Sequence, residues 1–189
     1  NDWHRTGPVS AKLTKLPDGK EELLVTCTAD DCSPGSGNNG KVEDDGRGLN
    51  GILLSDIKLR GSKPYLFGAV GITQVRKHPD DTDGPQGASD RKPWVCPVVL
   101  AFARASAGRA GDWETLVGNC QSPLPSQLEM ASSADLPIST SSFTSLKGGT
   151  LYNAGLYFGE GSRKGDNFLV RHMSIQQLAF PQLDTSTVS

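Results

Sequence analysis

Aromatic residues are scarce in this sequence. They make up 6% of its 189 residues, with three Trp, three Tyr and six Phe. A site that holds flat ligands on a row of aromatic platforms needs more of these side chains at the surface, so the scarcity weighs against an extended stacking site. One group, formed by Tyr152, Tyr157 and Phe158, falls within a single short segment.

Neither sign of charge is in excess. Lys and Arg number 19 against 21 Asp and Glu, which gives a formal charge of −2. A nucleic-acid-binding domain carries a basic patch, so we expect no nucleic-acid contact. The longest apolar run, Val95–Ala103, is interrupted by Pro97 and is too short to cross a bilayer. We therefore also expect no membrane insertion.

Clustered metal ligands are missing as well. None of the four cysteines forms a C-x-x-C pair, and His4, His78 and His172 are far apart in the sequence. Zinc sites need ligands at short, regular spacing, so the sequence predicts no metal and no cofactor. It also lacks any N-x-S/T glycosylation acceptor, which favours a protein that never visits the secretory pathway. Because the chain begins at Asn1 rather than Met, we expect a mature or excised fragment.

The cysteines are predicted to be reduced in at least two positions. Cys96 lies in the apolar segment WVCPVVL, which is typical of a buried thiol. Together with the missing glycosylation acceptors, this setting predicts free thiols at Cys27 and Cys96, as expected for assembly in a reducing cytosol. Cys27 and Cys32 are nevertheless close enough in sequence to form a bridge, so that alternative stays open.

Strand-like segments recur along the chain. Several alternate apolar and polar residues with period two, and turn-forming Gly, Pro, Asn, Asp and Ser separate them. The pattern predicts an all-β fold, a compact antiparallel β-sandwich or β-barrel with long polar surface loops and little helix. The expected strands are Glu22–Thr28, Asn50–Leu59, Tyr65–Arg76, Pro93–Ala105, Asp112–Gly118, Gly149–Gly159 and Asn167–Met173.

Helical signals are few. Ser126–Leu136 could form two helical turns, and the segment after Asn167 has some helical spacing. No linker divides the chain, so we expect one β-rich domain over 1–180 and an exposed C-terminal extension over 181–189. Two loops, Ala29–Gly48 and Lys77–Lys92, are long enough to be functional.

The first long loop contains GSGNNG, a match to the G-x-G-x-x-G dinucleotide fingerprint. That fingerprint needs a helix directly after the glycines, where free backbone N–H groups meet the pyrophosphate. Here Gly46, Gly48 and Gly51 follow, and each would weaken a helix by about 1 kcal/mol relative to alanine. Glu43 and the neighbouring aspartates would repel a phosphate. The stretch is interpreted as a turn-rich surface loop.

The second long loop contains PDDTDGPQGASD, which partly matches a calcium-binding loop. Asp81, Asp83 and Gly84 fall at suitable positions, but Pro79 has no side-chain oxygen for the first ligand position. We interpret the segment as a solvated acidic loop. A possible glycosidase pair is formed by Asp112 and Glu114, whose side chains would lie about 7 Å apart on one strand face. We consider a polar outer face, with Trp113 packed inward, the better interpretation.

The chain as a whole resembles the spike, or projection, domain of a small non-enveloped RNA virus capsid, and within that class the avian astrovirus spike. The stretches that carry the resemblance are NDWHRTGPVSAKLTKLPDGKEELLVTC, GDWETLVGNCQSPLPSQLEM and GGTLYNAGLYFGEGSRKGDNFLVRH. The resemblance implies a β-barrel-like domain on the virion surface that is assembled in the host cytoplasm and joined to the rest of the capsid protein. It also implies a homodimer, and the apolar aromatic segment LYNAGLYFG independently favours one.

The resulting hypothesis is a spike domain that attaches the virion to a host-surface receptor, either protein or glycan, and catalyses nothing. Loops held by a rigid β scaffold are suited to recognition. Two alternatives stay open, a carbohydrate-binding β-sandwich module of a secreted protein and a jelly-roll glycan-active enzyme relying on Asp112 and Glu114. The candidate receptor-binding residues lie in the two long loops and are Asp80, Asp81, Asp83, Gln86, Ser89, Asn38 and Asn39.

Overall fold

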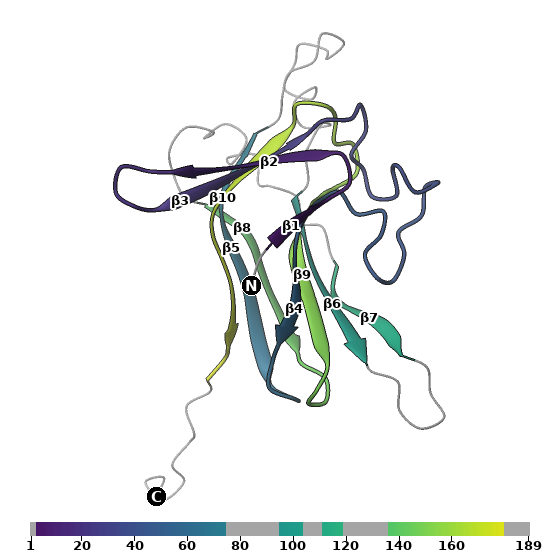
Figure 1. Cartoon of the computed structure of the whole chain (residues 1–189). Coiled ribbons are helices and arrows are strands. Elements are labelled where there is room, and N and C mark those ends of the chain that lie inside the picture. Colours follow the sequence, from purple (N-terminus) through teal and green to yellow (C-terminus); the bar gives the residue numbers. More distant parts are fainter. Residues whose placement is uncertain (1–2, 75–94, 104–110, 119–135, 180–189) are drawn as a thin grey trace, which may run out of the picture.

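The described residues form an antiparallel β-sandwich of two five-stranded sheets (Figure 1). The computed structural model describes residues 3–74, 95–103, 111–118 and 136–179. Sheet A contains, in spatial order, β1 (Trp3–Thr6), β4 (Gly51–Lys58), β9 (Leu151–Phe158), β6 (Val95–Ala103) and β7 (Asp112–Val117). Sheet B contains β2 (Val9–Lys15), β3 (Glu21–Cys27), β10 (Asn167–Gln177), β5 (Pro64–Gln74) and β8 (Leu136–Thr144). The all-β prediction is confirmed.

The main core lies between the two sheets and follows from the period-two alternation of their strands. In β9, Tyr152, Ala154, Leu156 and Phe158 all point inward and are at most 1% exposed. Phe158 meets Phe168 of β10 across the sandwich, with ring centroids 4.9 Å apart. Such tilted aromatic contacts contribute beyond the area they bury. The aromatic residues of LYNAGLYFG are therefore used inside the domain.

The N-terminal hairpin of sheet B extends beyond the sandwich (Figure 1). The chain reverses between β2 and β3 at a Pro-Asp-Gly turn, in which Gly19 has φ +84° and Asp18 Oδ1 accepts the backbone N–H of Lys20 at 3.0 Å. Glycine adopts this left-handed conformation without a steric penalty. Because the hairpin tip has no opposing sheet, Leu13 is 52% exposed although it alternates in register with buried Val9.

Several elements differ from the sequence prediction. The short strands β1 and β2 and the hydroxyl-rich β8 were not predicted, because weak hydrophobic alternation gives little local signal for an edge strand. The segment after Asn167 is a strand throughout, and no helix occurs in the described ranges. Residues 126–135 of the candidate helix, and the extension over 181–189, lie outside those ranges. No described helix is long and apolar enough to cross a membrane.

Candidate functional site

The outer face of sheet A carries a second apolar cluster, which the 29–48 loop helps to cover. Gly46 lies so close to this face that a Cβ there would be 2.9 Å from Leu100 Cδ1. Trp113 packs against the edge of the cluster. Sheet A is consequently covered on both faces over part of its area, and the loop is not a free excursion. The buried members of the cluster are Leu49, Leu53, Cys96, Val98, Leu100 and Tyr157.

The glycines of GSGNNG serve backbone turns. Gly35 donates its N–H to the carbonyl of Gly48 at 2.8 Å, and its own carbonyl accepts the N–H groups of Asn38 and Gly40. Gly35, Gly37 and Gly40 all have positive φ, and a Cβ at Gly35 would lie 2.6 Å from the carbonyl carbon of Gly40. Only glycine fits such a position. No helix follows, so the interpretation of this stretch as a turn-rich loop is confirmed.

Asn50 fixes the loop to the sandwich. Its side chain is 1% exposed, and its Nδ2 lies 3.1 Å from the carbonyl oxygens of both Cys32 and Ser33 and 2.9 Å from Ser36 Oγ. Buried amide groups need such partners because an unpaired one costs about 1–3 kcal/mol. Gly7 passes directly over Asn50, since a Cβ at Gly7 would lie 2.0 Å from Asn50 Oδ1. The Asn50 side chain therefore holds the loop by hydrogen bonds to Cys32, Ser33 and Ser36, and it packs against Gly7 in the turn between β1 and β2.

A cavity of about 510 Å³ lies between this loop and the outer face of sheet A. Its volume falls in the range of about 300–1,000 Å³ that is usual for small-molecule sites. Apolar groups, including those of Pro8, Leu49 and Leu53, form the larger part of its wall, and amides, hydroxyls, a guanidinium and a carboxylate lie among them. The polar residues that line it are His4, Thr6, Ser36, Asn38, Asp45, Arg47, Asn50, Ser55 and Asn153.

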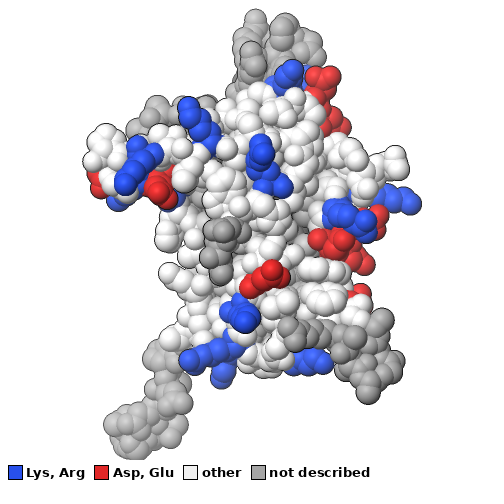
Figure 2. Space-filling view, viewed as in Figure 1, with Lys and Arg blue, Asp and Glu red and all other residues white. Residues whose placement is uncertain are grey.

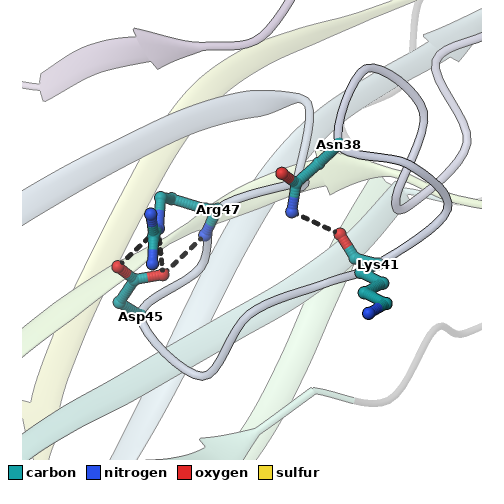
Figure 3. Close-up of polar contacts among 4 residues, drawn as sticks. All are labelled: Asn38, Lys41, Asp45 and Arg47. Atoms are coloured by element: carbon teal, nitrogen blue, oxygen red, sulfur yellow. Dashed lines mark hydrogen bonds and ion pairs between the residues drawn. The ribbon is translucent and has the colours of Figure 1, made fainter.

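Two of the lining residues, Asp45 and Arg47, form an ion pair, which Figure 3 shows. Arg47 Nε is 2.9 Å from Asp45 Oδ2, and the backbone N–H of Arg47 donates to Asp45 Oδ1 at 3.1 Å. The Arg47 side chain is 74% exposed, so this pair adds little to stability but leaves guanidinium donors available to a ligand. Nearby, Asn38 Nδ2 donates to the carbonyl of Lys41 at 2.8 Å, which fixes the orientation of the amide (Figure 3).

The predicted recognition residues fall into two groups. Asn38 lines the cavity, whereas Asn39 is exposed outside it with a φ of 55°. The acidic-loop candidates Asp80, Asp81, Asp83, Gln86 and Ser89 lie outside the described residues. His4, Arg47 and Asn153 also line the cavity but have no local signal in the sequence, because the elements that carry them meet only in the folded chain. Within the described ranges, no three His, Cys, Asp or Glu side chains are grouped so that they could hold a metal.

Trp113 packs on the opposite face from the one expected. In the register of β6 and β7, Trp113 pairs with Phe102, and their ring centroids lie 5.0 Å apart on the outer face of sheet A. Glu114 pairs with buried Ala101, and Asp112, two residues earlier, lies on the same face of β7. The carboxylates of both residues therefore lie on the main-core side of the strand, beyond the edge of that core. Both Asp112 and Glu114 are exposed. The reason is that both faces of sheet A bury apolar groups, and alternation alone cannot tell them apart.

Tyr157 connects the outer cluster to the edge of the sheet. Its hydroxyl donates to the carbonyl of Gly118 at 3.0 Å, just after the end of β7. Burial of the ring raises the pKa of Tyr157 above its ordinary value, because the phenolate would lose its hydration. The phenol therefore stays a neutral hydrogen-bond donor that holds β7 beside the cluster.

The prediction of free thiols at Cys27 and Cys96 is wrong. Cys27 and Cys32 form a disulfide, and Cys96 is also disulfide-bonded. The alternative that Cys27 and Cys32 form a bridge is the one the structure has. The 27–32 bridge closes the base of the 29–48 loop, where the N–H of Cys32 also donates to the carbonyl of Ser162 at 3.1 Å. Bonds of this kind persist in oxidising compartments and not in a reducing cytosol.

We expect the Cys27–Cys32 bridge to contribute measurably to stability. Replacing both cysteines with serine should lower the free energy of unfolding by about 2 kcal/mol, because a short closed loop then regains its freedom in the unfolded chain. Urea unfolding of the oxidised protein and of the Cys27→Ser/Cys32→Ser variant measures the difference. Alkylation without reductant should label none of Cys27, Cys32 and Cys96, and labelling of Cys27 would contradict the bridge.

Charges of both signs are interspersed on the face shown in Figure 2, and no large area there has a single sign. The pattern agrees with the near-zero net charge of the sequence. A ligand recognised by this face therefore need not be a polyanion or a polycation.

The fold is similar to that of carbohydrate-binding modules in solved structures. No family model and no curated protein matches the chain. The N-terminal CBM22-1 and GH10 modules of Clostridium thermocellum endo-1,4-beta-D-xylanase 10B, solved with xylohexaose, share 8% identity at a TM-score of 0.53. That match covers 94% of this chain and 26% of the xylanase chain, so the domain spans about a quarter of it.

Two further structures have lower TM-scores. The CBM22-1–CBM22-2 tandem domain of Paenibacillus barcinonensis Xyn10C has a TM-score of 0.49 at 14% identity, over 96% of this chain and 43% of the tandem. The N-terminal cellulose-binding domain of Cellulomonas fimi beta-1,4-glucanase C also has 0.49, at 10% identity, over 95% and 90% of the two chains. None of these structures is viral, and the resemblance to a capsid spike stays a prediction.

Proposed function

We propose that this domain is a non-catalytic carbohydrate-binding module, and that it holds an oligosaccharide segment in the cavity between the 29–48 loop and sheet A. The observation that carries the proposal is the lining of the cavity, where amides and hydroxyls lie beside the aliphatic groups of Leu49 and Leu53. A sugar offers the complementary pattern, since its hydroxyls both donate and accept hydrogen bonds. The fold is similar to part of a xylanase chain of CBM22-1 and GH10 modules that was solved with xylohexaose, and this likeness supports the same class of ligand.

The charges at the cavity also favour a neutral ligand. Asp45 and Arg47 offer acceptors and donors side by side, and together they carry no net charge. A pair of neighbouring hydroxyls can accept from the guanidinium and donate to the carboxylate. The disulfides support the secreted type of module that the sequence left open as an alternative. Trp113 and Phe102 offer a separate aromatic surface at the other edge of the sheet.

The carboxylates argue for binding without hydrolysis. A glycosidase usually needs two of them flanking the bond, about 5–9.5 Å apart. Asp45 is the one carboxylate among the described lining residues, and it is paired with Arg47. Asp112 and Glu114 are on β7, at the far edge of sheet A from β1, and neither lines the cavity. The enzyme alternative that relied on these two residues is not the one we propose.

Titration calorimetry of the whole domain tests the proposal. We expect saturable binding of xylohexaose or of a member of a glycan panel, and Arg47→Ala should weaken it at least about tenfold, because hydrogen bonds to a charged group contribute about 1.5–3 kcal/mol. Arg60→Ala is the matched control, since Arg60 is also exposed but does not line the cavity. Equal losses in both variants, or hydrolysis of the bound glycan, would contradict the proposal.

The glycan panel also distinguishes two biological origins of a carbohydrate ligand. Plant-type xylans and glucans represent the substrates of secreted degradative enzymes, and cell-surface glycans represent a host receptor. Binding confined to the second group would support the attachment role that the capsid resemblance implies. Failure of every glycan to bind would remove the carbohydrate proposal altogether.

A further inference from the structure

The apolar wall of the cavity beside sheet A is aliphatic. Among the described residues that line the cavity, none is Trp, Tyr or Phe. Leu49 and Leu53 line it instead, and both belong to the apolar cluster on the outer face of the sheet. The flat face of a sugar ring packs best on a flat aromatic ring, whereas the branched ends of leucine side chains suit a compact apolar group such as a methyl. The lining therefore favours a ligand that carries such a group.

A β-bulge in β4 shapes the floor of this cavity. Between two regular pairs of β4 and β9, Ser55 and Asp56 of β4 both lie opposite the single residue Asn153 of β9. The extra residue allows Ile57 to pack against the main core, while Ser55 and Asn153 line the cavity on the other face. Asp56 has a φ of 58°, which is uncommon for a residue other than glycine. Bulges frequently occur beside binding sites, where they re-aim side chains.

The bulge also fixes the amide group of Asn153. The backbone N–H of Asp56 donates to Asn153 Oδ1 at 3.2 Å, so the amide is oriented with its Nδ2 left to donate. Asn153 is half-buried, and within the described ranges its Nδ2 has no hydrogen-bond partner. Leaving such a donor without an acceptor costs free energy, which a ligand with a suitable oxygen recovers.

Asn153 and Leu53 lie close together on the outer face of sheet A. Leu53 pairs with Gly155 of β9, and Asn153 is two residues before Gly155, so Leu53 and Asn153 are diagonal neighbours. Diagonal neighbours on one face of a sheet are about 7–8 Å apart. Both side chains line the cavity, so one small ligand group can accept a hydrogen bond from Asn153 and contact Leu53 at the same time.

We propose that the cavity recognises an acetyl group on the glycan, with the carbonyl oxygen accepting from Asn153 Nδ2 and the methyl group packed against Leu53. This inference rests on the proposed function and names the class of glycan. An acetyl group combines one strong acceptor with one methyl group, which is the combination that Asn153 and Leu53 recognise. A plain hydroxyl accepts the same hydrogen bond but brings no methyl group to the leucine. Acetamido sugars and O-acetylated sugars both carry the acetyl group.

Titration calorimetry with two matched pairs of oligosaccharides tests the inference and distinguishes these two sources. The first pair is chitohexaose and cellohexaose, which carry an acetamido group and a hydroxyl at the same position of each sugar. The second pair is O-acetylated xylohexaose and plain xylohexaose. In at least one pair, the acetylated member should bind about tenfold more tightly, because it adds a buried methyl group and a stronger acceptor. The pair that shows the preference identifies the type of acetylated sugar.

Asn153→Asp tests the residue that we assign to the carbonyl oxygen. The aspartate retains the Oδ1 that accepts from Asp56 but replaces the Nδ2 donor with an acceptor, so the preference for the acetylated member should be lost. The matched control is Asn39→Asp, which makes the same change in an exposed residue outside the cavity and should keep the full preference. If Asn153→Asp does not fold, as judged by circular dichroism, Asn153→Ala removes the same donor.

The possible failures of the inference and of the proposed function are distinguishable. Equal affinity for both members of both pairs, with binding that Arg47→Ala still weakens, would overturn the acetyl inference and leave the proposed function in place. A preference that survives loss of the Asn153 donor would also overturn the inference. If none of the four oligosaccharides binds, the acetyl inference is wrong, and the wider glycan panel decides the proposed function separately.

Discussion

Gly155→Ala is expected to destabilise the domain by more than about 4 kcal/mol, which is a large part of the 5–15 kcal/mol that holds a typical domain together. Gly155 lies in β9, the middle strand of sheet A, opposite Leu53 of β4. A Cβ at this position would lie 1.9 Å from the carbonyl oxygen of Ile52 and 2.9 Å from Cα of Leu53. Both are backbone atoms, so the strands themselves would have to separate.

Urea unfolding compares this variant with Gly68→Ala. Gly68 is also a strand glycine, in the middle of β5, but a Cβ there would meet only Ser174 Oγ at 3.9 Å. Alanine fits that space and reduces the freedom of the unfolded chain, so Gly68→Ala should be neutral or slightly stabilising. A Gly155→Ala protein with nearly natural stability would show that β4 and β9 do not approach each other as described.

Asn50→Asp is the second change from which we expect a large effect. The substitution keeps the shape of the side chain but replaces its Nδ2 donor with a carboxylate oxygen. That oxygen would face the carbonyls of Cys32 and Ser33 in a position that is 1% exposed. The lost hydrogen bonds and the buried charge should together cost about 3 kcal/mol or more and release residues 33–48 from sheet A.

Asn153→Asp is the matched control because it makes the same chemical change in the same cavity. Asn153 uses its Oδ1 to accept the backbone N–H of Asp56 at 3.2 Å, and an aspartate retains that acceptor. Its stability should change by less than about 1 kcal/mol. Amide hydrogen exchange should show lost protection over 33–48 in the Asn50 variant alone. Unchanged protection there would mean that Asn50 does not hold the loop.

Asn50→Asp and Gly155→Ala also distinguish the role of the loop in ligand binding from that of the sheets. If the cavity holds the glycan, Asn50→Asp should abolish binding even under conditions where both sheets remain folded. Gly155→Ala should instead lose binding only together with the fold.

The strand pattern of this protein could largely be predicted from its sequence. The alternation that places Phe168 and Val170 on one side of a strand is local, and so are the turns in GSGNNG, where the glycines have positive φ. The pattern predicted the edge strands of the two sheets least well. Strands such as β8, with its run of Ser and Thr, take their conformation from the neighbour they pair with rather than from their own residues.

Only the tertiary structure decides which faces of the two sheets are covered. Alternation separates Trp113 from Glu114, but it does not indicate that the outer face of sheet A is buried under a loop. The cavity brings His4 of β1 and Asn153 of β9 together with Arg47 of the loop, although they are far apart in the chain. Periodicity reports interactions between near neighbours in the chain, whereas burial, the Cys27–Cys32 bridge and the cavity arise from contacts that exist only once the sheets and the loop have packed.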